Sequence, residues 1–129
     1  MWRMVWGAGL DPTDLHWAHF LIAEHAGQIV GIGQVRPAAS ELGSLVVVPH
    51  FRGQGAGGML IDALVARTAG DVYLECNATL APYYARHGFT EIAPMQAPPA
   101  LRRKAMIGGR VAKWFGLRLA VMKRPSSIA

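Results

Sequence analysis

The sequence is poor in cysteine, in charge and in long apolar runs. Cys76 is the single cysteine among 129 residues, which excludes an internal disulfide, and the apolar run from Val72 around it indicates a buried small side chain. No apolar run approaches the roughly 20 residues that span a bilayer, and residues 1–10 are too short and too interrupted by glycine for a secretory leader. These absences predict a cytoplasmic protein without redox chemistry.

The residue types that are present favour a folded domain. Charged residues make up only 16% of the chain and hydrophobic residues 52%, which excludes a disordered polypeptide. The length fits one domain over 1–129, with a core over 8–92 that holds the candidate site and a C-terminal helix and closing strand over 93–129. The net charge of +5 indicates an anionic partner, and a phosphate-bearing cofactor, RNA and a membrane surface all satisfy it.

Local patterns predict the order of the elements. Asp11-Pro12 supplies a helix start, and the runs Phe20–Glu24 and Gln28–Val35 are strand-like and close enough to form an antiparallel hairpin. The next strand, Glu41–Val48, is apolar and β-branched at its end, as in a strand covered on both faces. The further predicted elements are a helix over 57–69, a strand over 71–76, a helix over 80–86, a strand over 89–92, a helix over 101–115 and a strand over 117–122.

The predicted helix over 101–115 carries conflicting signals. An apolar stripe at helical spacing favours a helix, whereas Gly108 and Gly109 each cost about 1 kcal/mol relative to alanine, so a kinked or two-piece helix is predicted. Its basic residues suit a solvated face, or, together with Trp114 nearby, a surface that binds RNA or an anionic membrane. The stripe is Leu101, Ala105, Gly108, Ala112 and Phe115, and the basic residues are Arg102, Arg103, Lys104, Arg110 and Lys113.

A glycine-rich loop follows the apolar strand and leads into a helix. Such a loop leaves several N–H groups unpaired, and Gly53, Gly55 and Gly57 lack the side chains that would hold a phosphate away from them. Arg52 adds a positive charge at the mouth of the loop, and the helix dipole adds to the attraction. The segment therefore predicts an anion-binding site.

Two phosphate-binding motifs compete for this loop. A Walker A loop is excluded because no Gly-Lys-Ser/Thr follows. The dinucleotide fingerprint is met by Gly53-x-Gly55-x-x-Gly58, and Glu75 lies about 20 residues further on, where an acid that binds ribose belongs. Against it, residues 49–52 separate the glycines from the strand, and the preceding chain is antiparallel in pattern rather than βαβ.

The whole segment Leu45–Gly57 resembles the acetyl-CoA-binding motif of the GNAT superfamily of N-acetyltransferases. Arg52, Gly55 and Gly57 match the family's Arg/Gln-x-x-Gly-x-Gly/Ala. A second family signature follows in the correct order, as Asn77 and then Tyr84, whose surroundings to Gly88-Phe89 resemble Tyr-x-x-x-Gly-Phe. The resemblance covers residues 20–92 and, more loosely, 117–122.

This resemblance implies an α/β fold with a mixed, mainly antiparallel twisted sheet of about six strands flanked by helices. The family usually begins with a strand and a helix for which this chain has only about a dozen residues before Asp14. Either the start of the sequence is truncated, or the exposed edge of the sheet is covered in another way, as by a second copy in a homodimer.

The resemblance also implies transfer of an acetyl group from acetyl-CoA to a primary amine, by direct attack in a ternary complex. Tyr84 is the implied general acid, the Val46 N–H is the implied oxyanion donor, and Glu41, Glu75 or a chain of waters would be the base. The implied cofactor-binding residues are Val46, Val47, Val48, Arg52, Gly53, Gln54, Gly55, Ala56, Gly57, Asn77 and Tyr84.

Several other functions stay open on the sequence alone. The amine acceptor can be a small molecule or a protein, and a domain that only senses acetyl-CoA, or a basic module that binds RNA or a membrane, would use the same composition. A dinucleotide-binding domain is a further alternative. His16-x-x-His19, with His25 nearby, has ligand spacing but no accompanying acid or cysteine, so no metal is expected.

Overall fold

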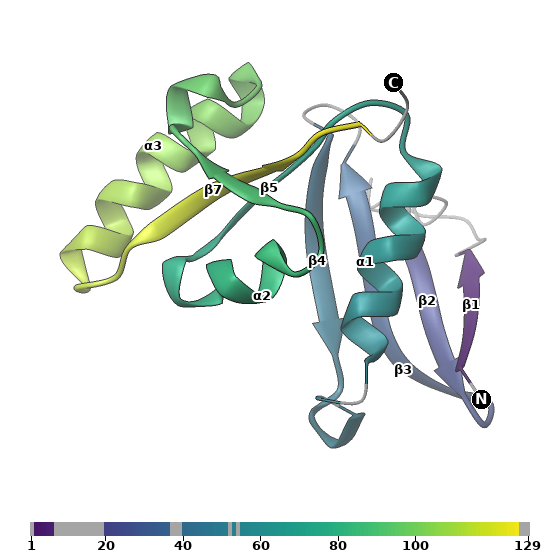
Figure 1. Cartoon of the computed structure of the whole chain (residues 1–129). Coiled ribbons are helices and arrows are strands. Elements are labelled where there is room, and N and C mark those ends of the chain that lie inside the picture. Colours follow the sequence, from purple (N-terminus) through teal and green to yellow (C-terminus); the bar gives the residue numbers. More distant parts are fainter. Residues whose placement is uncertain (1, 7–19, 37–39, 52, 54, 127–129) are drawn as a thin grey trace, which may run out of the picture. The chain divides into compact units, whose positions relative to one another are not determined.

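The computed structural model describes residues 2–6, 20–36, 40–51, 53 and 55–126 (Figure 1). Its contacts divide the chain into two compact units, residues 1–36 with 42–68 and residues 37–41 with 69–129. The helix predicted from Asp11 toward His19 lies outside the described residues.

The first unit is built on an antiparallel hairpin. Strands β2 (Phe20–His25) and β3 (Gln28–Arg36) are joined by Ala26 and Gly27, with φ of 52° and 79°. Two consecutive positive φ values give a turn whose twist matches that of the flanking strands. The predicted hairpin is thus confirmed.

An additional strand lies at the N-terminal edge. Strand β1 (Trp2–Trp6) pairs antiparallel with β2, with Trp2 opposite His25 and Trp6 opposite Leu21. The sequence did not predict this strand, which occupies the sheet edge beside β2. Aromatic and β-branched residues favour strands, but five residues are too few for alternation alone to identify one.

Helix α1 (Ala56–Arg67) packs on β2 and β3 and completes the core of the first unit (Figure 1). Leu60, Ile61 and Leu64 are buried on its inner face. A Cβ at Gly31 of β3 would lie 3.0 Å from Leu60 Cδ1 and 3.1 Å from the Val46 carbonyl oxygen. Glycine at this position therefore lets the helix and β4 (Glu41–Val47) approach β3 closely.

The second unit contains β5 (Val72–Asn77), α2 (Ala81–Ala85), β6 (Thr90–Ile92), α3 (Pro99–Trp114) and β7 (Leu119–Arg124). Strand β7 is antiparallel to both β5 and β6, and Glu41 at the start of β4 is parallel to Tyr73 of β5. The described strands follow the order β1-β2-β3-β4-β5-β7-β6 in a seven-stranded sheet. The predicted mixed, mainly antiparallel sheet is confirmed, with one strand more than the six expected.

Helix α3 is continuous over its 16 residues, so the two-piece alternative of the prediction at Gly108-Gly109 is wrong. Leu101 and Ala105 pack with Ala97 and Val121 in a buried cluster, and this packing stabilises the helix against its glycines. A Cβ at Gly108 would lie 3.4 Å from both Glu75 Oε1 and Leu119 Cδ1, which explains the small residue. Phe115, predicted to be in the apolar stripe, is instead 72% exposed.

Cys76 lies on β5 and is buried, as the sequence predicts. Its Sγ lies 4.0 Å from the Met122 Sδ of β7. Burial raises the pKa of the thiol, and the negative charges of Glu91 and Glu75 raise it further. The residue therefore behaves as a small core side chain.

Candidate functional site

The glycine loop of the first unit leads from β4 into α1. After a 3₁₀ turn over Pro49–Phe51, Gly53 has a φ of 79° and Gly55 a φ of 90°. L side chains rarely adopt such angles, so both positions favour glycine on conformational grounds. Both glycines are exposed, and a Cβ built on either would have no atom within 4 Å. Arg52 and Gln54 lie outside the described residues.

The N-terminus of α1 offers unpaired backbone donors. Gly55 is the N-cap, has no side chain to bond the first turn, and accepts from the Met59 N–H at 3.0 Å as the first helical hydrogen bond. The N–H groups of Ala56, Gly57 and Gly58 therefore have no partner within the helix. The first turn carries no acidic residue that would oppose an anion. Donors and dipole together suit a phosphate.

The end of β4, next to this loop, presents apolar side chains to solvent. Val46 is 54% exposed and Val48 37% exposed, and the two point to the same side of the strand because side chains alternate. Val47 between them is partly buried. The Val48 N–H donates to the Val30 carbonyl at 2.8 Å and keeps the residue that follows β4 beside β3.

In the second unit, the two candidate bases meet a common lysine. The Glu41 side chain is 8% exposed, and the Lys104 Nζ of α3 lies 2.7 Å from its Oε2. Glu75 of β5 has a buried Oε2 with no hydrogen-bond partner among the described residues. Burial raises the pKa of Glu75, the charge of Lys104 opposes this, and the charge of Glu41 adds to it. The three residues form one coupled charge cluster.

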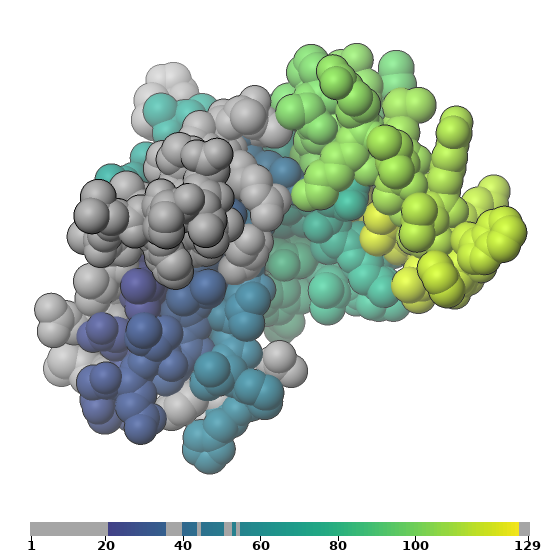
Figure 2. All heavy atoms as spheres, turned by 180° about the vertical axis from the view of Figure 1, so that it is seen from behind, coloured from purple at the N-terminus to yellow at the C-terminus, as the bar shows by residue number. Residues whose placement is uncertain are grey.

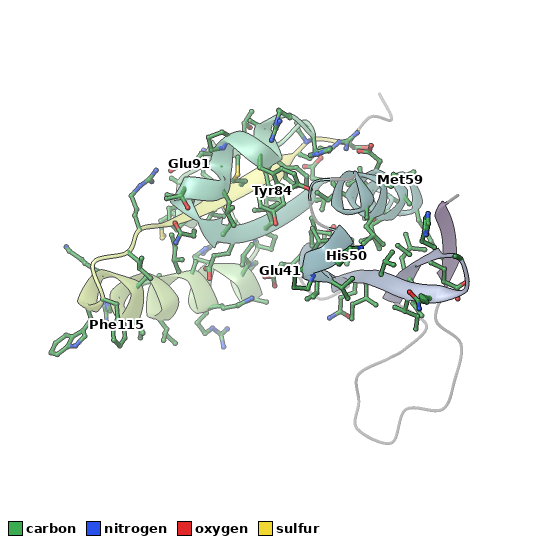
Figure 3. The ribbon with its side chains drawn as sticks, turned by 90° about the horizontal axis from the view of Figure 1, so that it is seen from below. Glu41, His50, Met59, Tyr84, Glu91 and Phe115 are labelled. Atoms are coloured by element: carbon green, nitrogen blue, oxygen red, sulfur yellow. The ribbon has the colours of Figure 1, made fainter. Side chains whose placement is uncertain are left out.

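Tyr84 lies on α2, on the other side of the strands of the second unit from α3 (Figure 3). Its ring packs edge-to-face on Tyr83 at 5.2 Å and on Phe89 at 6.0 Å between centroids. Burial raises the pKa of the phenol, and interactions with Cys76 and Tyr83 raise it further. The phenol therefore holds its proton through neutral pH.

Asn77 ends β5 and shapes the start of the segment that carries Tyr84. Its Oδ1 accepts from both the N–H and the Oγ1 of Thr79, each at 3.0 Å. At the other end of this segment Gly88 has a φ of 87°, and the following Phe89 is 1% exposed. The spacing from Tyr84 to Gly88 and Phe89 thus has a structural reason: the glycine ends the helical segment and the phenylalanine anchors it.

The sequence candidates fall into two groups. The valines of β4 and the glycine loop with Ala56 belong to the first unit, and Glu41, Glu75, Asn77 and Tyr84 belong to the second. The sequence does not predict the ion pair of Lys104, because this lysine lies among basic residues that suit a solvated helix face. A helical period places it beside the buried stripe, but its partner is 63 positions away in sequence. Among the described residues, no group of three acidic, histidine or cysteine side chains could hold a metal.

Comparison with known proteins gives a family match and a curated relative. The model of the acetyltransferase (GNAT) domain matches residues 16–91. An amino-acid acetyltransferase of Mycobacterium tuberculosis is 37% identical over 82 residues, which cover 57% of this chain and 47% of that protein. The matched segment thus spans about half the length of the curated relative.

Solved structures share the fold. N-acetylglutamate synthase from Neisseria gonorrhoeae, complexed with coenzyme A and N-acetyl-glutamate, has a TM-score of 0.76 at 16% identity, over 98% of this chain and 35% of that one. Rv2747 from Mycobacterium tuberculosis, in complex with CoA and NLQ, has a TM-score of 0.62 at 27% identity, over 84% and 76%. The ribosomal-protein-S18-alanine N-acetyltransferase from Escherichia coli has a TM-score of 0.61 at 19% identity, over 100% and 96%.

Replacing Lys104 with methionine should destabilise the protein, because the buried Glu41 carboxylate would lose its partner. The loss expected for a hydrogen bond to a buried charge, reduced because Lys104 is half exposed, is roughly 1–2 kcal/mol in urea unfolding at pH 7. Arg103→Met on the exposed face of the same helix is the control and should change stability by less than about 0.5 kcal/mol. Equal stabilities of the two variants would contradict a structural role for the ion pair.

Proposed function

The chain belongs to the acetyltransferase (GNAT) domain family, and from that premise we propose that it transfers an acetyl group from acetyl-CoA to a primary amine by direct attack in a ternary complex. The observation that carries the proposal is the open N-terminus of α1, where a cap without a side chain leaves the first-turn amides available to a phosphate. The family match covers this loop and the segment around Tyr84 together.

The residues of the glycine loop fit acetyl-CoA. Gly53 and Gly55 leave the space above the backbone open, and the amides from Ala56 onward supply donors for a pyrophosphate. Arg52 and Gln54 belong to the proposed site through the family motif. The exposed apolar end of β4, Val46 to Val48, is the proposed place for the pantetheine arm. When bound, the cofactor supplies an acetyl group activated as a thioester.

The chain's own residues handle the protons and the charge of the reaction. The amine nitrogen forms a bond to the acetyl carbon as the carbon–sulfur bond breaks, and the Val46 N–H is proposed to stabilise the oxygen that gains charge. Tyr84 is proposed to donate its proton to the leaving sulfur. A raised pKa suits this role because the phenol reaches the reaction still protonated. Asn77 is proposed to order the adjoining turn.

The proton that the amine loses is proposed to pass to the carboxylate pair Glu41 and Glu75. Glu75 contributes a buried oxygen that no described residue bonds, and burial moves its pKa toward neutral pH, where a base is most effective. Glu41 is coupled to it through Lys104. Because Glu75 and Cys76 are consecutive on β5, Glu75 points to the opposite face from Cys76, the residue whose thiol interacts with Tyr84. Acid and base thus act from different sides of β5.

An α-amino acid is the proposed acceptor. The curated relative is an amino-acid acetyltransferase, and the structure with the TM-score of 0.76 is an N-acetylglutamate synthase. A protein N-terminus is the competing acceptor, since the Escherichia coli enzyme of the same fold is named for a ribosomal-protein alanine.

Acetyl-CoA should raise the thermal stability of the protein, because a ligand that binds only the folded state stabilises it by mass action. At a concentration 100 times Kd the gain is about 2.7 kcal/mol. NAD is the control and should give no shift. Free amino acids and a peptide with an N-terminal alanine should then be compared as acceptors by release of CoA. Stabilisation by NAD instead of acetyl-CoA would refute the proposal, and binding without turnover on any amine would indicate a sensor.

Tyr84→Phe should lower kcat by roughly 10²- to 10⁴-fold, the usual contribution of a general acid, while acetyl-CoA affinity stays unchanged. Tyr83→Phe is the matched control, since Tyr83 precedes Tyr84 on α2 and its ring packs against the ring of Tyr84. Steady-state kinetics and calorimetric titration with acetyl-CoA would separate the two effects. Equal kcat values for wild type and Tyr84→Phe would remove Tyr84 from the mechanism.

Glu75→Gln and Glu41→Gln should each lower kcat/KM, because each removes one charge of a coupled pair. The variant that lacks the proton acceptor should also lose the acidic limb of the pH profile of kcat/KM, which reports the pKa of the base in the free enzyme. Glu91→Gln serves as the control, because that carboxylate is exposed and paired with Arg118 instead. Unchanged profiles in both variants would indicate that water carries the proton without these residues.

A further inference from the structure

Helix α3 has two apolar faces, and folding accounts for only one of them. The first face carries Leu101, Ala105 and Ala112, which are buried. The second face carries Ile107, Val111 and Trp114, which are 65%, 55% and 87% exposed. Their spacing of four and then three residues places them along one side of the helix. An ordinary surface helix has a single apolar stripe facing the core, so the second stripe requires another explanation.

The exposed apolar surface continues beyond the helix. Phe115 and Leu117 are 72% and 50% exposed, and Figure 3 shows Phe115 at the end of α3 pointing away from the helix. Met106, on the same helix, is 50% exposed. Figure 2 shows the yellow-green atoms of α3 on the outer surface of the second unit. We call Met106, Ile107, Val111, Trp114, Phe115 and Leu117 the outer apolar surface of α3.

Basic side chains border this surface. Arg103, Arg110 and Lys113 are exposed, and no ion pair among the described residues engages them. The sequence of α3, PALRRKAMIGGRVAKW, contains no acidic residue at all. On a helical projection Arg103 and Arg110 lie beside the stripe of Ile107, Val111 and Trp114. The outer apolar surface of α3 is therefore bordered by positive charge.

These two properties distinguish between the candidate partners. A second copy of this face would place like charges opposite each other, which is unfavourable. A nucleic acid would satisfy the positive charges, but protein surfaces bind it mainly through phosphate contacts and aromatic stacking, which leaves Ile107 and Val111 in water. An anionic lipid surface can bind both kinds of group. The apolar side chains would be buried among the acyl chains, and the arginines and lysine would pair with the anionic headgroups.

We propose that the outer apolar surface of α3 docks on membranes that contain anionic phospholipids. The helix is about 24 Å long at 1.5 Å per residue and would lie in the plane of the interface. Trp114 suits the headgroup level, where tryptophan is enriched. No helix in the described part of the chain is long and apolar enough to cross a bilayer.

Co-sedimentation with vesicles tests this proposal independently of catalysis. The chain should bind vesicles of phosphatidylcholine with phosphatidylglycerol, should not bind phosphatidylcholine alone, and should be released by salt. The double variant Arg110→Gln and Lys113→Gln should bind roughly 30-fold more weakly, at about 1 kcal/mol for each charge. The double variant Ile107→Ser and Trp114→Ser, which removes two of the apolar contacts, should abolish binding.

Met95→Ser is the control for the loss of an exposed apolar side chain, since Met95 is 66% exposed and lies outside α3. It should bind vesicles as the wild type does, and circular dichroism should show that all variants are folded. Absence of sedimentation with anionic vesicles would refute the proposal. So would a dimer in light scattering that the Ile107→Ser, Trp114→Ser variant dissociates, or binding of an RNA oligonucleotide in preference to vesicles.

Discussion

Glu41 is the residue on which the second unit depends most directly. Its backbone pairs with Tyr73 of β5, and beside it the Ser40 carbonyl accepts from the Tyr73 N–H at 2.9 Å. Its side chain is buried and bonded to Lys104 of α3. A buried carboxylate without a partner carries a large free-energy cost, so the ion pair and the strand pairing support each other. One residue thereby connects the start of β4 to a strand and to a helix.

The same constraint bears on catalysis. A carboxylate that holds α3 in place is not free to reorganise, whereas Glu75 has an oxygen that nothing in the described part of the chain engages. The proximity of Gly108 to Glu75 shows how closely the helix backbone approaches that carboxylate. The charge of Glu75 is thus governed by residues of α3 and β4, which are distant from it in sequence. The cluster of Glu41, Glu75 and Lys104 therefore both stabilises the second unit and contains the proposed base.

The features that the sequence predicts well are those determined by local chemistry. The hairpin at Ala26-Gly27 and the glycines before α1 follow from the backbone conformations that these residues adopt. The continuity of α3 was not predictable in this way, because packing of Leu101 and Ala105 outweighs the intrinsic cost of Gly108-Gly109. Lys104 was missed for a related reason, since its role depends on a partner far away along the chain.

The position of Cys76 has a practical consequence. The transfer proposed for this family member would release a free thiol at each turnover, and reagents that absorb on reaction with thiolates would count those turnovers. The only cysteine of the chain is buried and its pKa is raised, so it supplies little thiolate to such a reagent. The folded protein therefore contributes little to the signal of a colorimetric thiol assay, and most of that signal comes from the product.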